Sequence, residues 1–219
     1  MSFVERLSSN IAQSLGNRLD KNDEEIAVLN YGLFFIIHTT TALIATLLVG
    51  IVFNVLLEIM TISIVASSLK RYSGGVHSST PNRCTLSGLI LSISLAFCTK
   101  YISASFDYNR LLFFVVIILI SSIYIFYNKC PVPSKNKPLK NEKTRKKLRK
   151  KSFQLLSFYG ILIVIFLMIY NINEIYLIKT IVASVTLGVA LQTFSISKLG
   201  DIGINIFEKI FDIVNLNLL

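Results

Sequence analysis

A run of 44 residues with a single charge constrains this chain more than any other feature of its sequence. Residues 26–69 contain one charged side chain, that of Glu58. A helix of that length would be about 66 Å long at 1.5 Å per residue, which is about twice the hydrocarbon thickness of a bilayer. We therefore expect a hairpin of two membrane-spanning helices, over residues 28–48 and 51–69, with Gly50 in the turn.

Four further apolar runs follow, at residues 84–99, 111–128, 152–173 and 175–197. Each suits one bilayer crossing, which needs about 20 predominantly apolar residues. The composition agrees with a membrane protein, because only 16% of the residues are charged, which is fewer than the roughly 25% found in soluble domains. The sequence therefore predicts an all-α, polytopic membrane protein with about six spans in residues 26–197.

Both ends of the chain are predicted to form amphipathic helices, over residues 1–25 and 198–219. Near the start, apolar residues recur every three or four positions, which is the spacing of one helix face. These residues are Val4, Leu7, Ile11, Leu15 and Leu19. We expect both helices to lie in the membrane interface, and a partner-binding helix is the alternative for the first.

The net charge of +10 is concentrated in one segment, residues 129–151. This segment holds eleven basic residues and one acid, Glu142, while the other eleven basic and eleven acidic residues balance. The basic residues are Lys129, Lys135, Lys137, Lys140, Lys143, Arg145, Lys146, Lys147, Arg149, Lys150 and Lys151. Charge confined to one loop between apolar runs is typical of a cytoplasmic loop rather than of a nucleic-acid-binding domain. Nucleic acid is therefore not an expected partner.

The position of this basic loop orients the predicted spans. Cytoplasmic loops of membrane proteins are enriched in Lys and Arg, so we expect residues 129–151 in the cytoplasm. With six spans, both termini and the polar stretch of residues 70–83 fall on the same side. The bilayer is thus an expected partner, and anionic lipid would attract the basic loop.

Reactive side chains are concentrated in residues 70–84. This segment reads Lys-Arg-Tyr-Ser-Gly-Gly-Val-His-Ser-Ser-Thr-Pro-Asn-Arg-Cys. A Cys and a His suffice for acyl transfer through a thioester, because the thiolate attacks and the imidazole moves the proton. On a straight helix His77 and Cys84 would lie about 10 Å apart. The Gly-Gly pair and Pro81 favour a bend that would bring them together, although a polar loop with a structural cysteine also accounts for the spacing.

No metal site or other cofactor is expected. His38, His77, Cys84 and Cys98 lack the spacing of zinc ligands. The three cysteines are an odd number, which suits a reduced setting better than a disulfide scaffold. We expect Cys98 and Cys130 to be structural.

On the 70–84 segment the chain resembles the accessory gene regulator B (AgrB) family of bacterial membrane peptidases. The shared pattern is basic residues, then Gly-x-His with a small residue after it, and a Cys seven positions beyond the His. The hydrophobic spans and the basic, proline-containing loop also agree. The resemblance implies that Cys84 is the nucleophile and His77 the general base and acid. It implies supporting roles for Gly75 and for a basic residue at Lys70 or Arg71.

The resemblance also implies a quorum-sensing function in the bacterial cell membrane. The substrate would be an AgrD-like propeptide, cleaved near its C-terminus and cyclised to a thiolactone or lactone, and the enzyme would be a homodimer. The basic segment would guide the acidic propeptide tail. The guiding residues would be Lys143, Arg145, Lys146, Lys147, Arg149, Lys150 and Lys151.

Two alternatives from other classes remain at this point. One is a small membrane transporter or exporter of peptides without peptidase activity, which we expect to show internal repeats or several charged residues within its spans. The other is a non-enzymatic membrane scaffold with a polybasic loop. Only the peptidase predicts a Cys84 thiol whose reactivity depends on His77.

Overall fold

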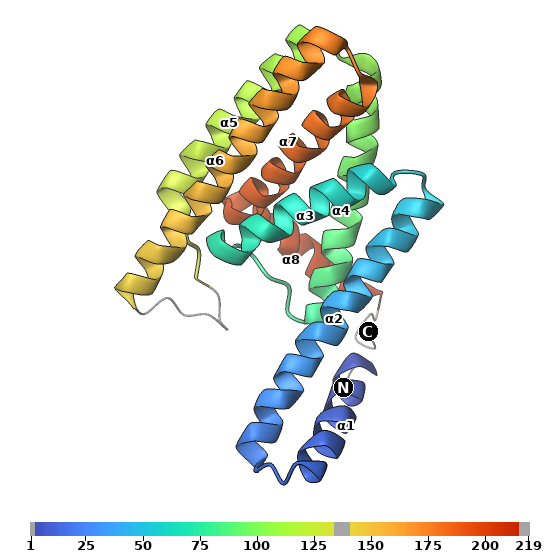
Figure 1. The fold of residues 1–219 in the computed structure, drawn as a ribbon, viewed down its shortest axis with the longest axis vertical. Helices are drawn as coiled ribbons and strands as arrows, with labels where there is room; N and C mark the ends of the chain where they lie inside the picture. The colour runs from blue at the N-terminus through green and yellow to red at the C-terminus, as the bar shows by residue number, and fades with distance from the viewer. Residues whose placement is uncertain (1–2, 134–140, 215–219) are drawn as a thin grey trace.

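The computed structural model describes residues 3–133 and 141–214, and its regular structure within them is entirely helical (Figure 1). The helices are α1 (Phe3–Arg18), α2 (Asp23–Val52), α3 (Leu56–Ser73), α4 (Pro81–Ser105), α5 (Tyr108–Lys129), α6 (Glu142–Asn173), α7 (Tyr176–Ile196) and α8 (Lys198–Ile213). Five of them, namely α2, α4, α5, α6 and α7, are long and apolar enough to cross a membrane. The predicted all-α, polytopic membrane fold is confirmed.

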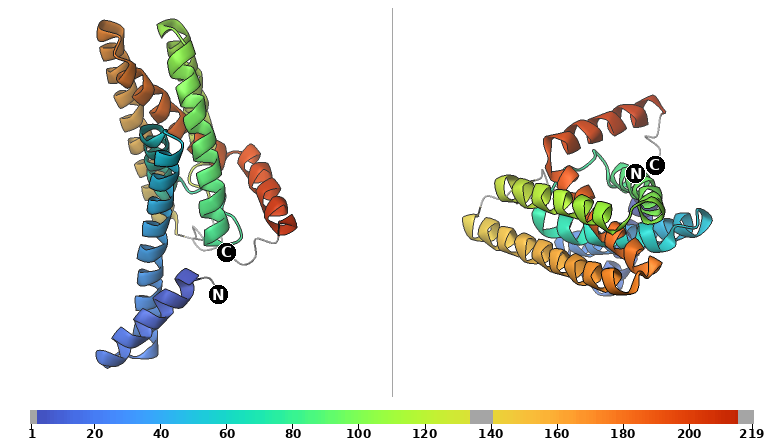
Figure 2. Two further views of the ribbon diagram at one scale, coloured as in Figure 1. Left: turned by 90° about the vertical axis from the view of Figure 1, so that its right-hand side faces the viewer. Right: turned by 90° about the horizontal axis from the view of Figure 1, so that it is seen from above.

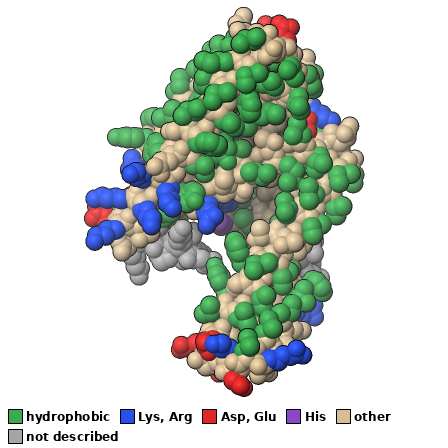
Figure 3. Space-filling view, viewed as in Figure 1, with side chains coloured by type: hydrophobic (Ala, Val, Ile, Leu, Met, Phe, Trp, Pro, Cys, Tyr) green, Lys and Arg blue, Asp and Glu red, His purple; other side chains and the backbone are tan. Residues whose placement is uncertain are grey.

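Helix α7 lies at the centre of the bundle. It contacts α3, α4, α5, α6 and α8, and it is the most buried of the five candidate spans. Helices α5 and α6 run together along one flank, while the first half of α2 extends with α1 beyond the rest of the bundle (Figures 1 and 2). The face of the bundle drawn in Figure 3 is largely apolar, as expected where side chains meet lipid tails rather than water.

The remaining predicted span corresponds to α3, which has 18 residues and carries Glu58, Lys70 and Arg71. Because α3 is only 18 residues long, all three charges fall within its one possible spanning stretch, whereas each of the five candidate spans contains an 18-residue stretch with at most two charges. Helix α3 packs against α2, α4, α6 and α7, so it need not be apolar all round. Its buried apolar residues are Ile59, Ile62, Val65 and Leu69. The structure thus supports five spans by length and composition, and the count of six stays a prediction.

The predicted turn at Gly50 is wrong. Helix α2 continues to Val52, and the chain reverses at residues 53–55, where Asn54 has a φ of 52°. Asn tolerates this left-handed conformation better than most residues. A Cβ atom on Gly50 would lie 2.9 Å from Cγ2 of Ile59. This glycine therefore permits close packing of α2 on α3 rather than forming the turn.

The predicted helix over residues 1–25 is in fact shorter and ends at Arg18. A new helix starts at Asp23 because Asn22 caps it. The side-chain oxygen of Asn22 accepts a 2.9 Å hydrogen bond from the Glu25 amide, and the Glu25 carboxylate accepts a 3.2 Å bond from the Asn22 amide. This reciprocal capping box satisfies backbone donors that would otherwise be unpaired at a helix start.

Helix α1 packs on α2 through small residues rather than through its apolar stripe. The buried residues are Val4, Ser8, Ala12 and Gly16. Small side chains let two helix backbones approach closely. The predicted stripe stays largely on the surface, with Leu7, Leu15 and Leu19 exposed. Its apolar side chains are therefore available to lipid.

The predicted basic loop, residues 129–151, is a loop only in part. Helix α6 starts at Glu142, so residues 142–151 form the first turns of a helix that continues as a candidate span. Lys and Arg are good helix formers. The side chain of Asn141 accepts a 2.9 Å hydrogen bond from the Lys143 amide, and Lys146 pairs with Glu142 at 2.8 Å.

With 32 residues, α6 is about 48 Å long, which exceeds a hydrocarbon core of about 30 Å. Its basic start therefore projects beyond the apolar part of the bundle (Figure 3). Lys135, Lys137 and Lys140 lie outside the described residues, as do residues 215–219 of the predicted C-terminal helix.

Candidate active site

The seven residues between α3 and α4 form a loop whose shape depends on two glycines. Gly74 has a φ of 71° and Gly75 a φ of 135°, and residues with a Cβ atom rarely adopt such angles. A Cβ atom on Gly75 would lie 2.6 Å from Oγ of Ser195. These glycines allow the chain to leave α3 and turn back against the end of α7.

Helix α4 begins directly after this loop, and Cys84 lies in its first turn. The side chain of Thr80 accepts a 3.3 Å hydrogen bond from the Arg83 amide, and Pro81 occupies the first helical position, where its missing N–H costs nothing. The cap and the proline therefore fix where α4 begins, and with it the position of Cys84 next to the loop.

The reversal brings His77 against Cys84. The Sγ atom of Cys84 lies 4.0 Å from Nδ1 of His77, much less than the separation on a straight helix. Hydrogen bonds between catalytic groups are often long in unliganded enzymes and shorten when substrate binds. The two residues are thus positioned so that the imidazole can take the thiol proton.

Three hydrogen bonds hold the first half of the loop. Nζ of Lys70 donates to the Val76 carbonyl at 2.9 Å, and the Val76 amide donates to the Ser195 carbonyl at 3.0 Å. Nε2 of Gln192 donates to the Gly74 carbonyl at 2.7 Å. Helices α3 and α7 therefore fix the backbone just before His77.

The surroundings of His77 favour its neutral form. His77 is exposed to solvent on one side. Its pKa is lowered first by the loss of water on the side that faces the protein, which disfavours the charged form, and second by the positive charge of Lys70. A neutral imidazole is the form that accepts a proton. His77 is therefore suited to act as a base near neutral pH.

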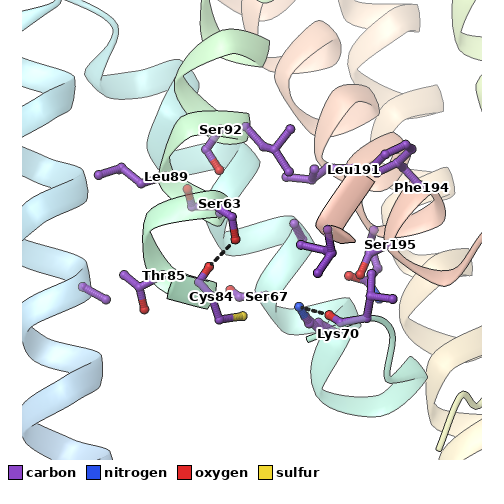
Figure 4. Close-up of a pocket in the computed structure, with 18 of the residues that line it drawn as sticks. Ser63, Ser67, Lys70, Cys84, Thr85, Leu89, Ser92, Leu191, Phe194 and Ser195 are labelled. Carbon is purple, nitrogen blue, oxygen red and sulfur yellow. Dashed lines mark hydrogen bonds between the residues drawn. The ribbon is translucent and has the colours of Figure 1, made fainter. Parts of the chain in front are cut away.

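A cavity of about 250 Å³ adjoins the Cys84 thiol. Cys84, Gly88 and Ser92 line it from α4, one turn apart, and Ser63, Ser67 and Lys70 line it from α3. In Figure 4 the sulfur atom points across the cavity toward Lys70, while Ser63 and Ser92 lie farther from the loop. This volume is just below the range of about 300–1,000 Å³ of small-molecule sites, so it suits a short segment of a peptide.

Of the two basic residues expected to support the site, Lys70 is the one that bonds to the loop. Arg71 is exposed, and its guanidinium lies 5.8 Å from the centre of the Tyr72 ring. Nζ of Lys151 lies 5.4 Å from the centre of the same ring. The basic start of α6 is therefore next to the end of α3.

The other predicted guiding residues lie in the first turns of α6. Arg149 donates a 2.8 Å hydrogen bond to the Tyr127 carbonyl, which ties α6 to the end of α5. The exposed ones are Lys143, Arg145, Lys146, Lys147 and Lys150. They form a basic surface at the same end of the bundle as the Cys84 loop.

Among the described residues, no hydrogen bond joins the remaining histidine or cysteines to His77 or Cys84, although His38 bonds to Thr85, the residue after Cys84. Nε2 of His38 lies 3.0 Å from Oγ1 of Thr85, Cys98 is exposed on α4, and Cys130 is buried beside the Ser73 carbonyl. Within residues 3–133 and 141–214, no group of three or more His, Cys, Asp or Glu side chains is arranged to hold a metal ion.

Several residues around the loop were not expected from the sequence. Gln192 and Ser195 are more than 100 positions from it along the chain, and Glu208 of α8 bonds to Ser79 and to Arg83. The sequence offers one local signal, because Glu208 and Asp212 are four residues apart in the predicted C-terminal helix. That spacing places two acids on one helix face, but it does not identify what they bind.

Comparison with known proteins gives one consistent result. A family model described as accessory gene regulator B matches residues 8–196. An AgrB-like protein 2 of Clostridium perfringens strain 13 is 33% identical over 201 residues, covering 91% of this chain and 94% of the relative. An AgrB-like protein of Clostridium perfringens strain SM101 is 32% identical with the same coverage. No solved structure matches the chain.

Proposed function

Because the chain belongs to the accessory gene regulator B family, whose members are peptidases that process AgrD propeptides, we propose that it is a membrane cysteine endopeptidase. It cleaves an AgrD-like propeptide near its C-terminus. The observation that supports this most is the 4.0 Å separation of Cys84 Sγ and His77 Nδ1 beside a cavity within the helix bundle.

The first half of the reaction is cleavage. His77 takes the thiol proton, and Sγ of Cys84 forms a bond to a backbone carbonyl carbon of the propeptide. The tetrahedral intermediate collapses, the C–N bond breaks, and His77 returns the proton to the leaving amine. The C-terminal tail departs, and the rest of the propeptide stays on Cys84 as a thioester.

The second half is release of a ring. A Cys or Ser side chain of the bound propeptide gives its proton to His77 and attacks the thioester carbonyl. The bond to Cys84 breaks and the sulfur is protonated again, so the product is a thiolactone or a lactone. Exchange between thioesters is nearly balanced in energy, so water must be kept from the acyl group. The cavity beside Cys84 supports this, because an acyl segment that fills it displaces the water there.

We also place the active site on the cytoplasmic side and expect a homodimer, as the family resemblance implies. Lys70, Arg71 and the basic start of α6 share one end of the bundle. Positive charge on short loops marks the cytoplasmic face. A propeptide made by ribosomes and a reduced thiol would meet there.

The rival functions, a peptide exporter and a membrane scaffold, predict no special reactivity at Cys84. An alkylating reagent in water distinguishes them, because the peptidase predicts that Cys84 reacts fastest with a pH profile that depends on His77. Burial raises the pKa of the Cys130 thiol, so that residue should react slowly. The labelled cysteine is identified by peptide mass spectrometry.

The direct test replaces the nucleophile. In vesicles containing the purified protein and a synthetic propeptide, Cys84→Ala should abolish cleavage, while Cys98→Ala should cleave as the unmodified protein does. Both variants should insert into the membrane in equal amounts. Cleavage at the normal rate by Cys84→Ala would disprove the proposal.

A further inference from the structure

A single carboxylate of the C-terminal helix accepts three hydrogen bonds from the segment between His77 and Cys84. Oε1 of Glu208 accepts from the Ser79 amide at 2.8 Å, and Oε2 accepts from the Ser79 hydroxyl at 2.8 Å. Oε2 also accepts from Nη1 of Arg83 at 2.6 Å. Glu208 thus joins α8 to the second half of the loop and to the first turn of α4.

Arg83 is bound to α8 at a second point. Its Nη2 atom donates a 2.7 Å hydrogen bond to Oδ1 of Asp212, one helical turn beyond Glu208. The Arg83 side chain is 9% exposed, and its guanidinium lies 5.9 Å from the centre of the Phe211 ring. A charge this buried requires opposite charges and hydrogen bonds around it. Helix α8 therefore holds the residue that directly precedes Cys84.

These contacts place His77 between two fixed points. Before it, Val76 is held by Lys70 and by the Ser195 carbonyl. After it, Ser79 is held by Glu208 at both its amide and its hydroxyl. If Ser79 were released, the loop would be fixed only at Val76, and the imidazole of His77, one residue beyond, could change its direction. The relative position of His77 and Cys84 is thus coupled to α8.

We propose that Glu208 is a positioning residue that keeps His77 aligned with Cys84. The proposal rests on the peptidase function proposed above and extends it to α8, which lies beyond residues 8–196 matched by the family model. Glu208 contacts neither reacting atom. It acts through Ser79 and Arg83, which flank the pair along the chain.

The ionisation of Glu208 is consistent with this role. Burial alone would raise its pKa, but the hydrogen bonds from the Ser79 amide, from Arg83 and from the Ser79 hydroxyl outweigh it, so the pKa is lowered. The carboxylate is therefore charged near neutral pH, when it binds the Arg83 guanidinium best.

The test compares Glu208→Ala with Asp201→Ala, which removes an exposed acid from the first turn of the same helix. Two measurements are made in vesicles: kcat and KM for cleavage of a synthetic propeptide, and the pH dependence of Cys84 alkylation by iodoacetamide. Displacing a reacting group by about 1 Å costs about 100-fold in rate. Glu208→Ala should therefore lower kcat by about 100-fold with little change in KM. The pH profile of Cys84 alkylation in this variant should approach that of His77→Ala.

Asp201→Ala should match the unmodified protein in both measurements. A kcat for Glu208→Ala within about twofold of the control, or an alkylation profile unchanged by the substitution, would overturn the proposal. A purely structural role would reduce the amount of folded protein without moving the alkylation profile of Cys84.

If Glu208→Ala does not accumulate in the membrane, the same measurements are made on Glu208→Gln. It keeps the size and one acceptor oxygen but presents an NH₂ group either to the Ser79 amide or to the Ser79 hydroxyl and Arg83 together. The kcat should therefore fall, and an unchanged kcat would count against the proposal. The alkylation measurement needs no propeptide. If the unmodified protein fails to cleave, the peptidase proposal fails, while the alkylation profiles still test the coupling of Glu208 to the pair.

Discussion

The ammonium group of Lys70 donates a 2.9 Å hydrogen bond to the carbonyl oxygen of Val76, the residue directly before His77. This one side chain therefore has two effects on the imidazole. It fixes the backbone next to His77, and its positive charge is the second cause, after the loss of water on the side that faces the protein, of the lowered pKa of that residue.

Lys70→Met should weaken both effects. A hydrogen bond made by a charged group contributes about 1.5–3 kcal/mol, so kcat for propeptide cleavage should fall by about ten- to a hundredfold. The acidic limb of the pH profile should also move to higher pH, because the pKa of His77 rises toward its usual value without the nearby positive charge. Arg71→Met is the matched control, since Arg71 is exposed and lies over Tyr72. Equal rates for the two variants would contradict the assignment to Lys70.

The acidic limb of kcat/KM in the unmodified protein should lie below pH 6.5, the usual pKa of histidine. Because the pKa of His77 is lowered, the neutral base persists as the pH falls through that value, and activity is lost only at lower pH. Measuring kcat/KM between pH 5 and 8 checks this expectation. An acidic limb centred above 6.5 would show that another group or environment controls the reaction.

Gly75→Ala should disrupt the loop. The φ of 135° at this position is strained for any residue with a Cβ atom, and that atom would lie 2.6 Å from Oγ of Ser195. Backbone strain of this kind costs about 1–3 kcal/mol, so cleavage should fall at least tenfold. Gly160→Ala is the control, because a Cβ atom there meets nothing within 4 Å. Adding Ser195→Gly to Gly75→Ala should restore only the part of the activity lost to the clash.

Gly88→Leu should fill part of the cavity beside Cys84. A Cβ atom at Gly88 meets nothing within 4 Å, and the residue lines the cavity one turn beyond the nucleophile. The larger side chain should raise KM for the propeptide while leaving the alkylation rate of Cys84 nearly unchanged. Gly160→Leu on α6 controls for adding the same side chain away from the cavity. An unaltered KM in Gly88→Leu would mean that the propeptide binds elsewhere.

The basic start of α6 should affect the KM for the propeptide only if it guides the acidic propeptide tail. Screening acts over about 8 Å at physiological salt, so replacing Arg145, Lys146 and Lys147 with Gln should raise KM most at low salt. The control replaces three basic residues near the N-terminus, namely Arg6, Arg18 and Lys21. If both variants respond alike at every salt concentration, guidance by α6 is excluded.

The spans were predictable because apolar length and charge are properties of contiguous residues. The runs at 84–99, 111–128 and 175–197 correspond to α4, α5 and α7, although α4 is longer than predicted and extends from Pro81 to Ser105. Gly50 was misassigned because a glycine is equally suited to a turn and to close helix packing. Its packing role depends on Ile59 of α3, which no local pattern around Gly50 reveals. The start of α6 was missed because a run of lysines looks the same in a polar loop and in a helix that projects beyond the bilayer.

The sequence by itself determined that the chain is a membrane protein with one very basic segment, and that its reactive residues lie between positions 70 and 84. Only the tertiary structure decided that His77 turns back to within 4.0 Å of Cys84, and that Ser195 and Glu208 hold the two halves of the loop. The physical reason is that hydrophobicity and charge act locally along the chain. Alignment of two side chains at hydrogen-bonding distance instead requires helices α7 and α8, more than 100 residues away, to pack against the loop.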